Sequence, residues 1–224
     1  LTYMSAYFHE DVVMVLGYSP LKRFKGWMSH ILQFDNLFSA IVAAAPTTWG
    51  LTLTSVGRNM AYRKSAYQAV GGYEALKQHR SGDDVYLTEQ FNRKAKGKIV
   101  FCRHPKTFVQ TLPVTDFKIF WHQQIRKNSK TLRKSVFNTL FSILAFGIYT
   151  YLWIFPLFKP QCFSLWLVII LLKLILEFVT LSLAAKIFQK QWLIPYFPLF
   201  QLFYPLYISF FTLLGTFQLY QWKR

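Results

Sequence analysis

The stretch "RSGDDVYLTEQF" places two adjacent carboxylates, Asp83 and Asp84, at the expected start of a helix. Acidic side chains in the first turn of a helix interact favourably with the helix dipole and with its free N–H groups, which accounts for one of the two. The second carboxylate is repelled by the first unless a cation or a hydroxyl group lies nearby. A helix-capping role and a catalytic role are therefore both consistent with these residues.

A second polar group occurs in "WHQQIRK", where Gln123 and Arg126 are three residues apart. In a helix with Thr115 as its expected N-cap, these two side chains share one face and can hold one ligand together. Phe117 and Trp121 belong to an apolar stripe on the same helix. Such a helix can lie in a membrane interface and present its polar face to a domain above it.

Several other catalytic and metal-binding patterns do not occur in the sequence. The five histidines do not approach metal-ligand spacing, and there is neither an HExxH motif nor a paired CxxC. The lack of GxSxG and P-loop patterns argues against a serine hydrolase and against a nucleoside triphosphatase. Cys102 and Cys162 are poor disulfide partners, which favours a reducing compartment for the polar part of the chain.

The elements that must position these side chains alternate between strands and helices. The residue pattern predicts strands at 12–16, 51–64, 98–102 and 108–112, and helices within 22–45, 65–74 and 83–96. Gly71 and Gly72 are expected to close the second of these helices. This alternation favours an α/β layered domain over residues 1–114, with functional residues at the strand ends and in the loops that follow them.

Charge and hydropathy divide the chain into two parts. Up to residue 135 there are 20 Lys and Arg against 8 Asp and Glu, whereas from residue 136 onward there are 6 against 1. Apolar segments at 136–158 and 162–185 are each long enough for one membrane span. The segment 192–220 is longer and contains three prolines, so one kinked span and a re-entrant hairpin both fit it. We therefore expect a transmembrane region over residues 136–224.

The segment 115–135, expected to be an amphipathic interfacial helix, carries a basic run next to the first apolar segment. The run contains no acid and consists of Arg126, Lys127, Lys130, Arg133 and Lys134. Under the positive-inside rule this indicates a cytoplasmic flank. Basic residues among aromatics also occur in nucleic-acid-binding modules, but their position beside the spans disfavours that reading.

Two opposite charges lie inside the second apolar segment. Lys173 and Glu177 are one helical turn apart, and isolated charges there would be costly. We expect them to pair toward the interior of the helix bundle. A structural ion pair and a part in a polar conduit are the two alternatives.

Taken together, the motifs "VGRNMAYRKSAYQAVGGYE", "SGDDVYLTEQF" and "WHQQIRK", directly before apolar segments, resemble the second half of a family 2 glycosyltransferase. This is the inverting, membrane-bound type that includes cellulose, chitin and hyaluronan synthases. The resemblance covers roughly residues 12–130 and the C-terminal apolar segments. It implies the second half of a GT-A-like domain that uses a nucleotide-diphosphate sugar, followed by an α-helical transmembrane region.

The resemblance also implies roles for individual residues. Asp84 matches the second acid of the family's paired-acid motif and would be the general base that accepts the proton of the acceptor hydroxyl. Asp83, Gln123, Gln124 and Arg126 would bind substrate, and Arg126 would also stabilise the departing diphosphate. Mg²⁺ or Mn²⁺ is the implied cofactor, with ligands mostly in a DxD motif that precedes these motifs in the family.

The implied function is transfer of a sugar from a nucleotide-diphosphate donor to a glycan or lipid-linked hydroxyl acceptor, in polysaccharide biosynthesis. The expected location is the cell inner membrane, with a cytoplasmic catalytic part in contact with membrane lipids and no nucleic-acid partner. Lys127 stands where the synthases carry a tryptophan, which leaves single transfer and processive synthesis both open. We also expect this chain to be a fragment, since Leu1 falls inside an expected domain. The alternative interpretation is a non-catalytic membrane protein or a degenerate transferase partner.

Overall fold

The computed structural model describes residues 2–74, 82–129 and 136–217. Lys130, Arg133 and Lys134 of the basic run lie outside the described residues, as does the end of the last apolar segment. The described part of the chain is mostly helical (66%) and contains a small sheet. It forms two compact units, the first comprising Leu1–Pro113 with Ala184–Lys190 and the second Val114–Leu183 with Gln191–Arg224. Each unit is described by itself.

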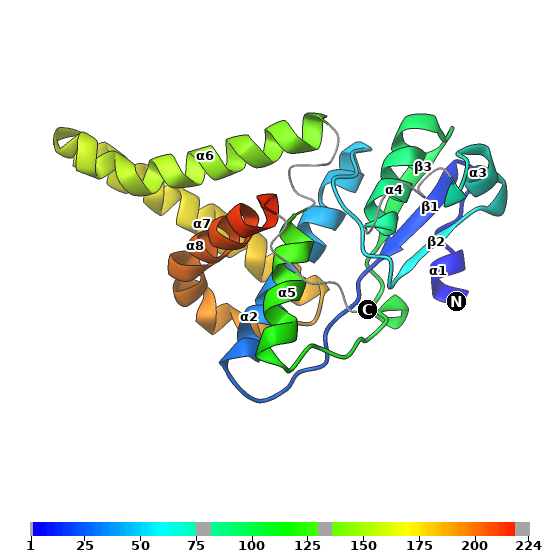
Figure 1. Ribbon diagram of the computed structural model, residues 1–224, viewed down its shortest axis with the longest axis horizontal. Helices are drawn as coiled ribbons and strands as arrows, with labels where there is room; N and C mark the ends of the chain where they lie inside the picture. The colour runs from blue at the N-terminus through cyan, green and yellow to red at the C-terminus, as the bar shows by residue number, and fades with distance from the viewer. Residues whose placement is uncertain (1, 75–81, 130–135, 218–224) are drawn as a thin grey trace. The chain divides into compact units, whose positions relative to one another are not determined.

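The first unit is built on a three-stranded sheet with the order β2-β1-β3 (Figure 1). The central strand β1 (Val12–Gly17) pairs antiparallel with β2 (Met60–Tyr62) and parallel with β3 (Lys98–Cys102). Every residue of β1 is buried, as its continuous apolar sequence VVMVLG requires of a strand covered on both faces. The strands predicted at 12–16 and 98–102 are confirmed.

Of the other two strand predictions, that at 51–64 is confirmed only in part and that at 108–112 was wrong. Only Met60–Tyr62 of the segment 51–64 is a strand, and the residues before it are irregular. The reason is that the Gly57 N–H donates to the Asp84 carboxylate instead of to a neighbouring strand. The segment 108–112 forms only an isolated bridge between Thr111 and Leu21.

Helices cover this sheet, and α4 lies along it in Figure 1. The bounds in the first unit are α1 (Thr2–Ser5), α2 (Trp27–Ala44), α3 (Lys64–Ala69) and α4 (Asp83–Lys94), with 3-10 turns η1 (Pro46–Trp49) and η3 (Pro105–Thr107). Gly71 and Gly72 follow α3 with φ angles of 87° and 51°, which confirms them as the residues that end this helix. Phe91 of α4 packs against Tyr62 of β2, with ring centroids 5.8 Å apart.

The second unit is helical. Its elements are α5 (Phe117–Asn128), α6 (Val136–Phe158), η5 (Pro160–Cys162), α7 (Phe163–Ile187), η6 (Gln191–Tyr196) and α8 (Phe197–Thr216). Helix α5 is capped by Asp116, whose Oδ1 accepts from the Ile119 N–H at 2.8 Å, so the prediction of Thr115 as cap was wrong. The described part of the last apolar segment is a 3-10 turn followed by one helix, without a hairpin.

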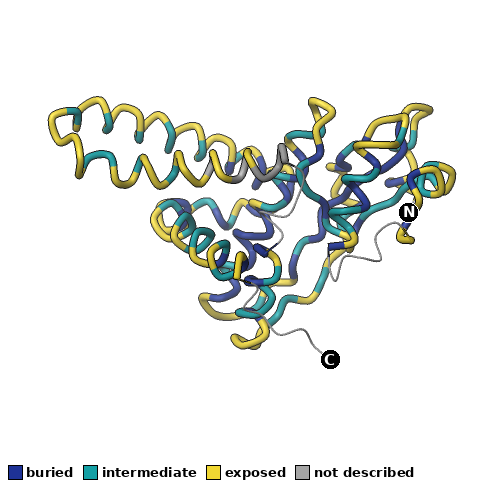
Figure 2. The backbone as a smooth tube through the Cα atoms, turned by 45° about the horizontal axis from the view of Figure 1, so that its top comes forward, coloured by how far each residue is buried: buried dark blue, intermediate teal, exposed yellow. Residues whose placement is uncertain are grey.

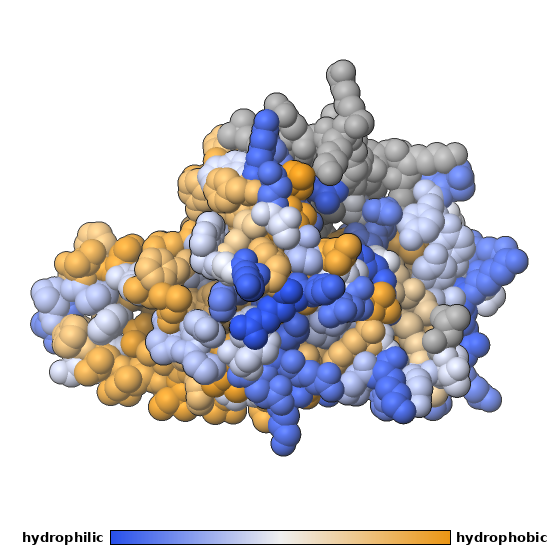
Figure 3. Space-filling view, turned by 90° about the horizontal axis from the view of Figure 1, so that it is seen from below, coloured by the Kyte–Doolittle hydropathy of each residue, from blue (hydrophilic) through white to orange (hydrophobic). Residues whose placement is uncertain are grey.

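Two helices in the described part of the chain are long and apolar enough to cross a membrane, at Pro160–Ile187 and Gln191–Thr216. In the most apolar 18-residue stretch of each helix, only 11% and 17% of the stretch is buried. The core helix of a soluble protein, by contrast, is mostly buried. A shorter apolar stretch, Phe146–Phe158, lies in α6. Figure 2 shows long exposed stretches on these helices, and Figure 3 shows apolar side chains gathered over them.

The paired charges of α7 belong to a polar cluster that links three helices. Lys173 Nζ lies 2.7 Å from Glu177 Oε2 and 3.3 Å from Gln201 Oε1 of α8. Tyr149 of α6 donates its hydroxyl to Glu177 Oε1 at 2.5 Å. The expected ion pair is therefore confirmed, and its contacts tie α6, α7 and α8 together, whereas a polar conduit stays a prediction.

Candidate functional site

Helix α4 begins in a way that fixes its two acids at the surface of the first unit. Gly82 occupies the N-cap position with φ 91° and ψ 22°, a left-handed conformation that glycine adopts without steric cost. Asp83 and Asp84 are then the first two helical residues, as predicted. Asp83 is exposed and Asp84 is half-buried.

The Asp84 carboxylate is held by backbone groups. Its Oδ2 accepts from the Gly57 N–H at 2.9 Å, and its Oδ1 accepts from the Val85 N–H at 2.9 Å. Each carboxylate oxygen has two lone pairs, so both oxygens can still accept another proton or hydrogen bond. A Cβ at Gly57 would lie only 3.0 Å from the Asp84 Cβ, so the close approach of the two segments depends on this glycine.

Two hydroxyl groups behind Asp84 strengthen this arrangement. Ser55 donates to the Asp84 backbone oxygen at 3.0 Å, and the Thr88 hydroxyl lies 2.8 Å from the Ser55 hydroxyl. Both Ser55 and Thr88 are buried. The first turn of α4 and the segment before β2 are thereby joined, which gives the carboxylate a defined position.

Arg58 is a functional candidate that the sequence reasoning missed. Loss of hydration lowers the pKa of its guanidinium, and the nearby charge of Asp84 offsets part of this effect. Burial raises the pKa of the Tyr18 hydroxyl, against the influence of Arg58. A cation therefore lies in the electrostatic neighbourhood of the Asp84 carboxylate. The sequence offers little sign of a role for Arg58. It only follows directly after Gly57, the residue that contacts Asp84 in the structure.

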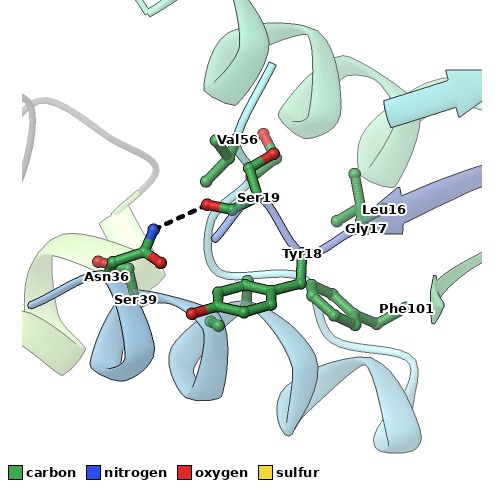
Figure 4. Close-up of a pocket in the computed structure, with 11 residues that line it drawn as sticks. Leu16, Gly17, Tyr18, Ser19, Asn36, Ser39, Val56 and Phe101 are labelled. Atoms are coloured by element: carbon green, nitrogen blue, oxygen red, sulfur yellow. Dashed lines mark hydrogen bonds between the residues drawn. The ribbon is translucent and has the colours of Figure 1, made fainter. Parts of the chain in front are cut away.

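A cavity lies beyond the carboxyl end of β1 (Figure 4). Its wall includes Tyr18 and Ser19 after β1, Asn36 of α2, and Ser55 and Val56 of the segment before β2. The crevice beyond the carboxyl ends of parallel strands is where ligands commonly bind in α/β domains, and β1 and β3 are such a pair. Ser55 connects this cavity to the Asp84 backbone.

The remaining predicted site residues lie on α5 in the second unit. Gln123 and Arg126 are half-buried, whereas Gln124 is 2% exposed, and its Oε1 has no hydrogen-bond partner among the described residues. Helix α8 packs against α5 through ring contacts such as that between Trp121 and Phe211, with centroids 5.2 Å apart. A Cβ at Gly215 would lie 2.6 Å from the Ser129 backbone nitrogen, so the close approach depends on this glycine.

The structure thus brings the predicted site residues together in two groups. Asp83 and Asp84 are neighbours in the first unit, and Gln123 and Arg126 share a stretch of α5 in the second. Each group keeps the spacing that the sequence indicated.

A divalent metal would need a group of oxygen, nitrogen or sulfur ligands. Over residues 2–74, 82–129 and 136–217, no three His, Cys, Asp or Glu side chains come together in such a group. Among these residues there is therefore no site in which three such side chains would hold Mg²⁺ or Mn²⁺.

Comparison with known proteins identifies the family. No curated protein matches the chain. The family model described as "Glycosyl transferase family 21" matches residues 3–217, almost the whole of the 224-residue chain. The expectation of a glycosyltransferase is confirmed, and the matching family is 21, where the motifs had resembled family 2. The chain belongs to glycosyl transferase family 21 and is a glycosyltransferase.

Proposed function

We propose that this glycosyltransferase is a membrane-integrated, inverting enzyme in which Asp84 is the general base. The donor is a nucleotide-diphosphate sugar, and the acceptor is a hydroxyl group of a glycan or of a lipid-linked sugar. The observation that carries this proposal is the Asp84 carboxylate, which two backbone N–H groups hold in place at the start of α4 in a chain of a glycosyltransferase family.

In the proposed reaction, the acceptor oxygen attacks the anomeric carbon while its proton moves to Asp84. A new C–O bond forms to the acceptor, and the C–O bond to the diphosphate breaks. The diphosphate leaves with the electron pair of that bond. Attack from the face opposite the leaving group inverts the anomeric configuration, and a positioned base of this kind contributes roughly 10²- to 10⁴-fold to the rate.

The leaving diphosphate needs positive charge and hydrogen-bond donors. We assign this role to Arg126 and Gln123, with Gln124 and Asp83 as further substrate-binding residues. A guanidinium can bind two phosphate oxygens at once, which suits a group whose negative charge grows in the transition state. Arg58 is a second candidate, since the charge of Asp84 in the first unit acts on the pKa of its guanidinium.

The proposal includes the location and the other partners. The two long apolar helices support anchoring in the cell inner membrane, with the first unit on the cytoplasmic side. Membrane lipids are then permanent partners, and polysaccharide biosynthesis is the process we assign. Mg²⁺ or Mn²⁺ would supply charge for the donor diphosphate, through ligands that the described residues do not form among themselves.

The test is the stereochemistry of transfer by the native membrane protein. Membranes containing it are incubated with a panel of nucleotide sugars of known anomeric configuration, and the product is analysed by NMR. We expect one donor to release nucleoside diphosphate and to give a product of inverted configuration. Retention of configuration, or no release from any nucleotide sugar, would overturn the proposal.

A further inference from the structure

Three residues that line the cavity beyond β1 each carry a buried polar atom without a partner among the described residues. Within the described part of the chain, the Tyr18 hydroxyl, the Ser19 hydroxyl and Asn36 Oδ1 make no hydrogen bond. The three residues are 2%, 2% and 9% exposed, and all three line this cavity. A buried polar group without a partner is costly, and such groups are rare in folded proteins. Three in one cavity therefore point to a ligand.

The chemistry of the three atoms defines the ligand. Two hydroxyls can each donate and accept, and the amide oxygen accepts only. The Asn36 amide nitrogen is already used, because it donates to the Ser19 backbone oxygen at 3.1 Å (Figure 4). A group that both donates and accepts hydrogen bonds satisfies this set, whereas an anion would lack a donor for Asn36 Oδ1.

The size of the cavity limits the ligand further. The volume open to the centre of a water molecule is about 20 Å³, which accommodates one water or one hydroxyl group but not a sugar ring. Ser39 and Val56 of its wall are half-buried, so the cavity reaches the protein surface.

The surrounding contacts hold the Tyr18 hydroxyl in place. The Asn59 side chain donates to the Tyr18 and Thr107 backbone oxygens at 2.8 and 2.9 Å. The Tyr18 ring packs against Phe108 and Phe188, with centroids 5.2 and 4.7 Å away. Rigid placement of this kind lets a hydrogen-bonding site discriminate between ligands.

The cavity is also linked to the proposed base. Ser55 lies in the cavity wall and donates to the backbone of Asp84, and the next residue but one, Gly57, donates to its carboxylate. The segment 55–57 therefore contacts both the cavity and the proposed base.

We propose that Tyr18, Ser19 and Asn36 form a subsite that recognises one hydroxyl group of a sugar substrate and so contributes to substrate specificity. This inference rests on the proposed function and names the residues that select the sugar. A water molecule fills the subsite until the hydroxyl replaces it. A site built to bind a hydroxyl rejects an analogue without it strongly, because its own polar groups are then left unpaired.

The test uses the native membrane protein and the variants Tyr18→Phe and Ser19→Ala. Each removes one unpartnered hydroxyl and keeps the shape of the side chain, so thermal stability is expected to stay the same or to rise. Tyr151→Phe is the matched control, because Tyr151 is 58% exposed on α6 and lies outside the cavity. kcat/KM is measured for the working donor and acceptor and for analogues that each lack one sugar hydroxyl.

We expect one deoxy analogue to react about 10- to 100-fold more slowly than the parent sugar with the unmodified protein. In Tyr18→Phe and Ser19→Ala this preference should shrink, while in Tyr151→Phe it should be unchanged. The subsite would be overturned if the unmodified protein and all three variants preferred the parent sugar over the deoxy analogue to the same extent. The cavity would then be the site of a structural water only. Absence of turnover by the unmodified protein with every nucleotide sugar would instead count against the proposed function.

Discussion

Gly57→Ala moves the proposed base without removing it. Gly57 does not need a left-handed backbone, so alanine is compatible with its conformation. The new Cβ would nevertheless lie 3.0 Å from the Asp84 Cβ, 3.5 Å from Oδ2 and 3.6 Å from Cγ. The Cβ atom is attached directly to the α4 backbone, so no side-chain rotation relieves the contact. Either the first turn of α4 or the segment 55–57 has to shift.

The size of this shift sets the expected effect. Ordinary contacts of a Cβ are 3.4–4 Å, so the two segments must separate by about 0.4–1 Å. A misplacement of about 1 Å in a catalytic group costs roughly 100-fold in rate, so we expect kcat/KM to fall by about 10- to 100-fold. The free energy of unfolding should fall by no more than about 2.6 kcal/mol, because overpacking of about 1–3 kcal/mol is partly offset by about 0.4–1 kcal/mol from the smaller entropy of the unfolded chain.

Under the proposed function, the assay is release of nucleoside diphosphate by the native protein, together with its thermal unfolding in detergent. Gly147→Ala is the control, because a Cβ at Gly147 of α6 meets nothing within 4 Å and the chemical change is identical. Gly57→Ala with full kcat/KM and normal unfolding would refute the idea that the position of Asp84 limits the rate.

Three further predictions concern the second unit. Gly215→Ala should lower the unfolding temperature relative to Gly147→Ala, because its Cβ would meet the backbone of Ser129 at 2.6 Å; equal unfolding temperatures would contradict the close packing of α8 on α5. Glu177→Ala should destabilise the protein by about 1–3 kcal/mol, because it leaves Lys173 without its carboxylate partner. Adding Lys173→Met should recover most of this loss. Thermal unfolding of both variants is the measurement, and a double variant no more stable than Glu177→Ala would contradict the ion pair. The protein should remain in the membrane pellet after alkaline carbonate and require detergent, and its release by carbonate would exclude spanning helices.

Local sequence signals predicted the helix that carries the acids and the long apolar helices. The "SGDD" stretch indicated the start of α4, and the structure places Gly82 at its N-cap. The apolar run between the basic segment and Pro160 gave the bounds of α6 at 136–158. In each case the signal lies within a few residues of the feature, as for capping residues and for hydrophobic stretches of bilayer length.

Long-range contacts could not be read in this way. The alternating pattern of 51–64 is that of a strand, but Gly57 donates its N–H to a carboxylate 27 residues later in the chain. The cavity likewise joins Tyr18, Ser19 and Asn36 to Ser55, and none of these residues has a motif of its own. Phe188 and Lys190 follow a long apolar helix, yet Phe188 packs on Tyr18 and Lys190 donates to Gln33 at 2.7 Å in the first unit.

The central claim is that Asp84 is the general base, and Asp84→Asn tests it most directly. The amide has nearly the same size and can still accept the Gly57 N–H, but it cannot take up the proton of the acceptor hydroxyl. Asp11→Asn is the matched control, since Asp11 is exposed and pairs only with Lys98 among the salt bridges of the described residues. In the native protein, we expect kcat for Asp84→Asn to fall by roughly 10²- to 10⁴-fold, and Asp11→Asn to retain full activity. The free energy of unfolding should fall by only about 1 kcal/mol, because the amide loses the bond from the Val85 N–H and the favourable charge at the start of α4. Turnover by Asp84→Asn within a few-fold of the unmodified protein would contradict the assignment.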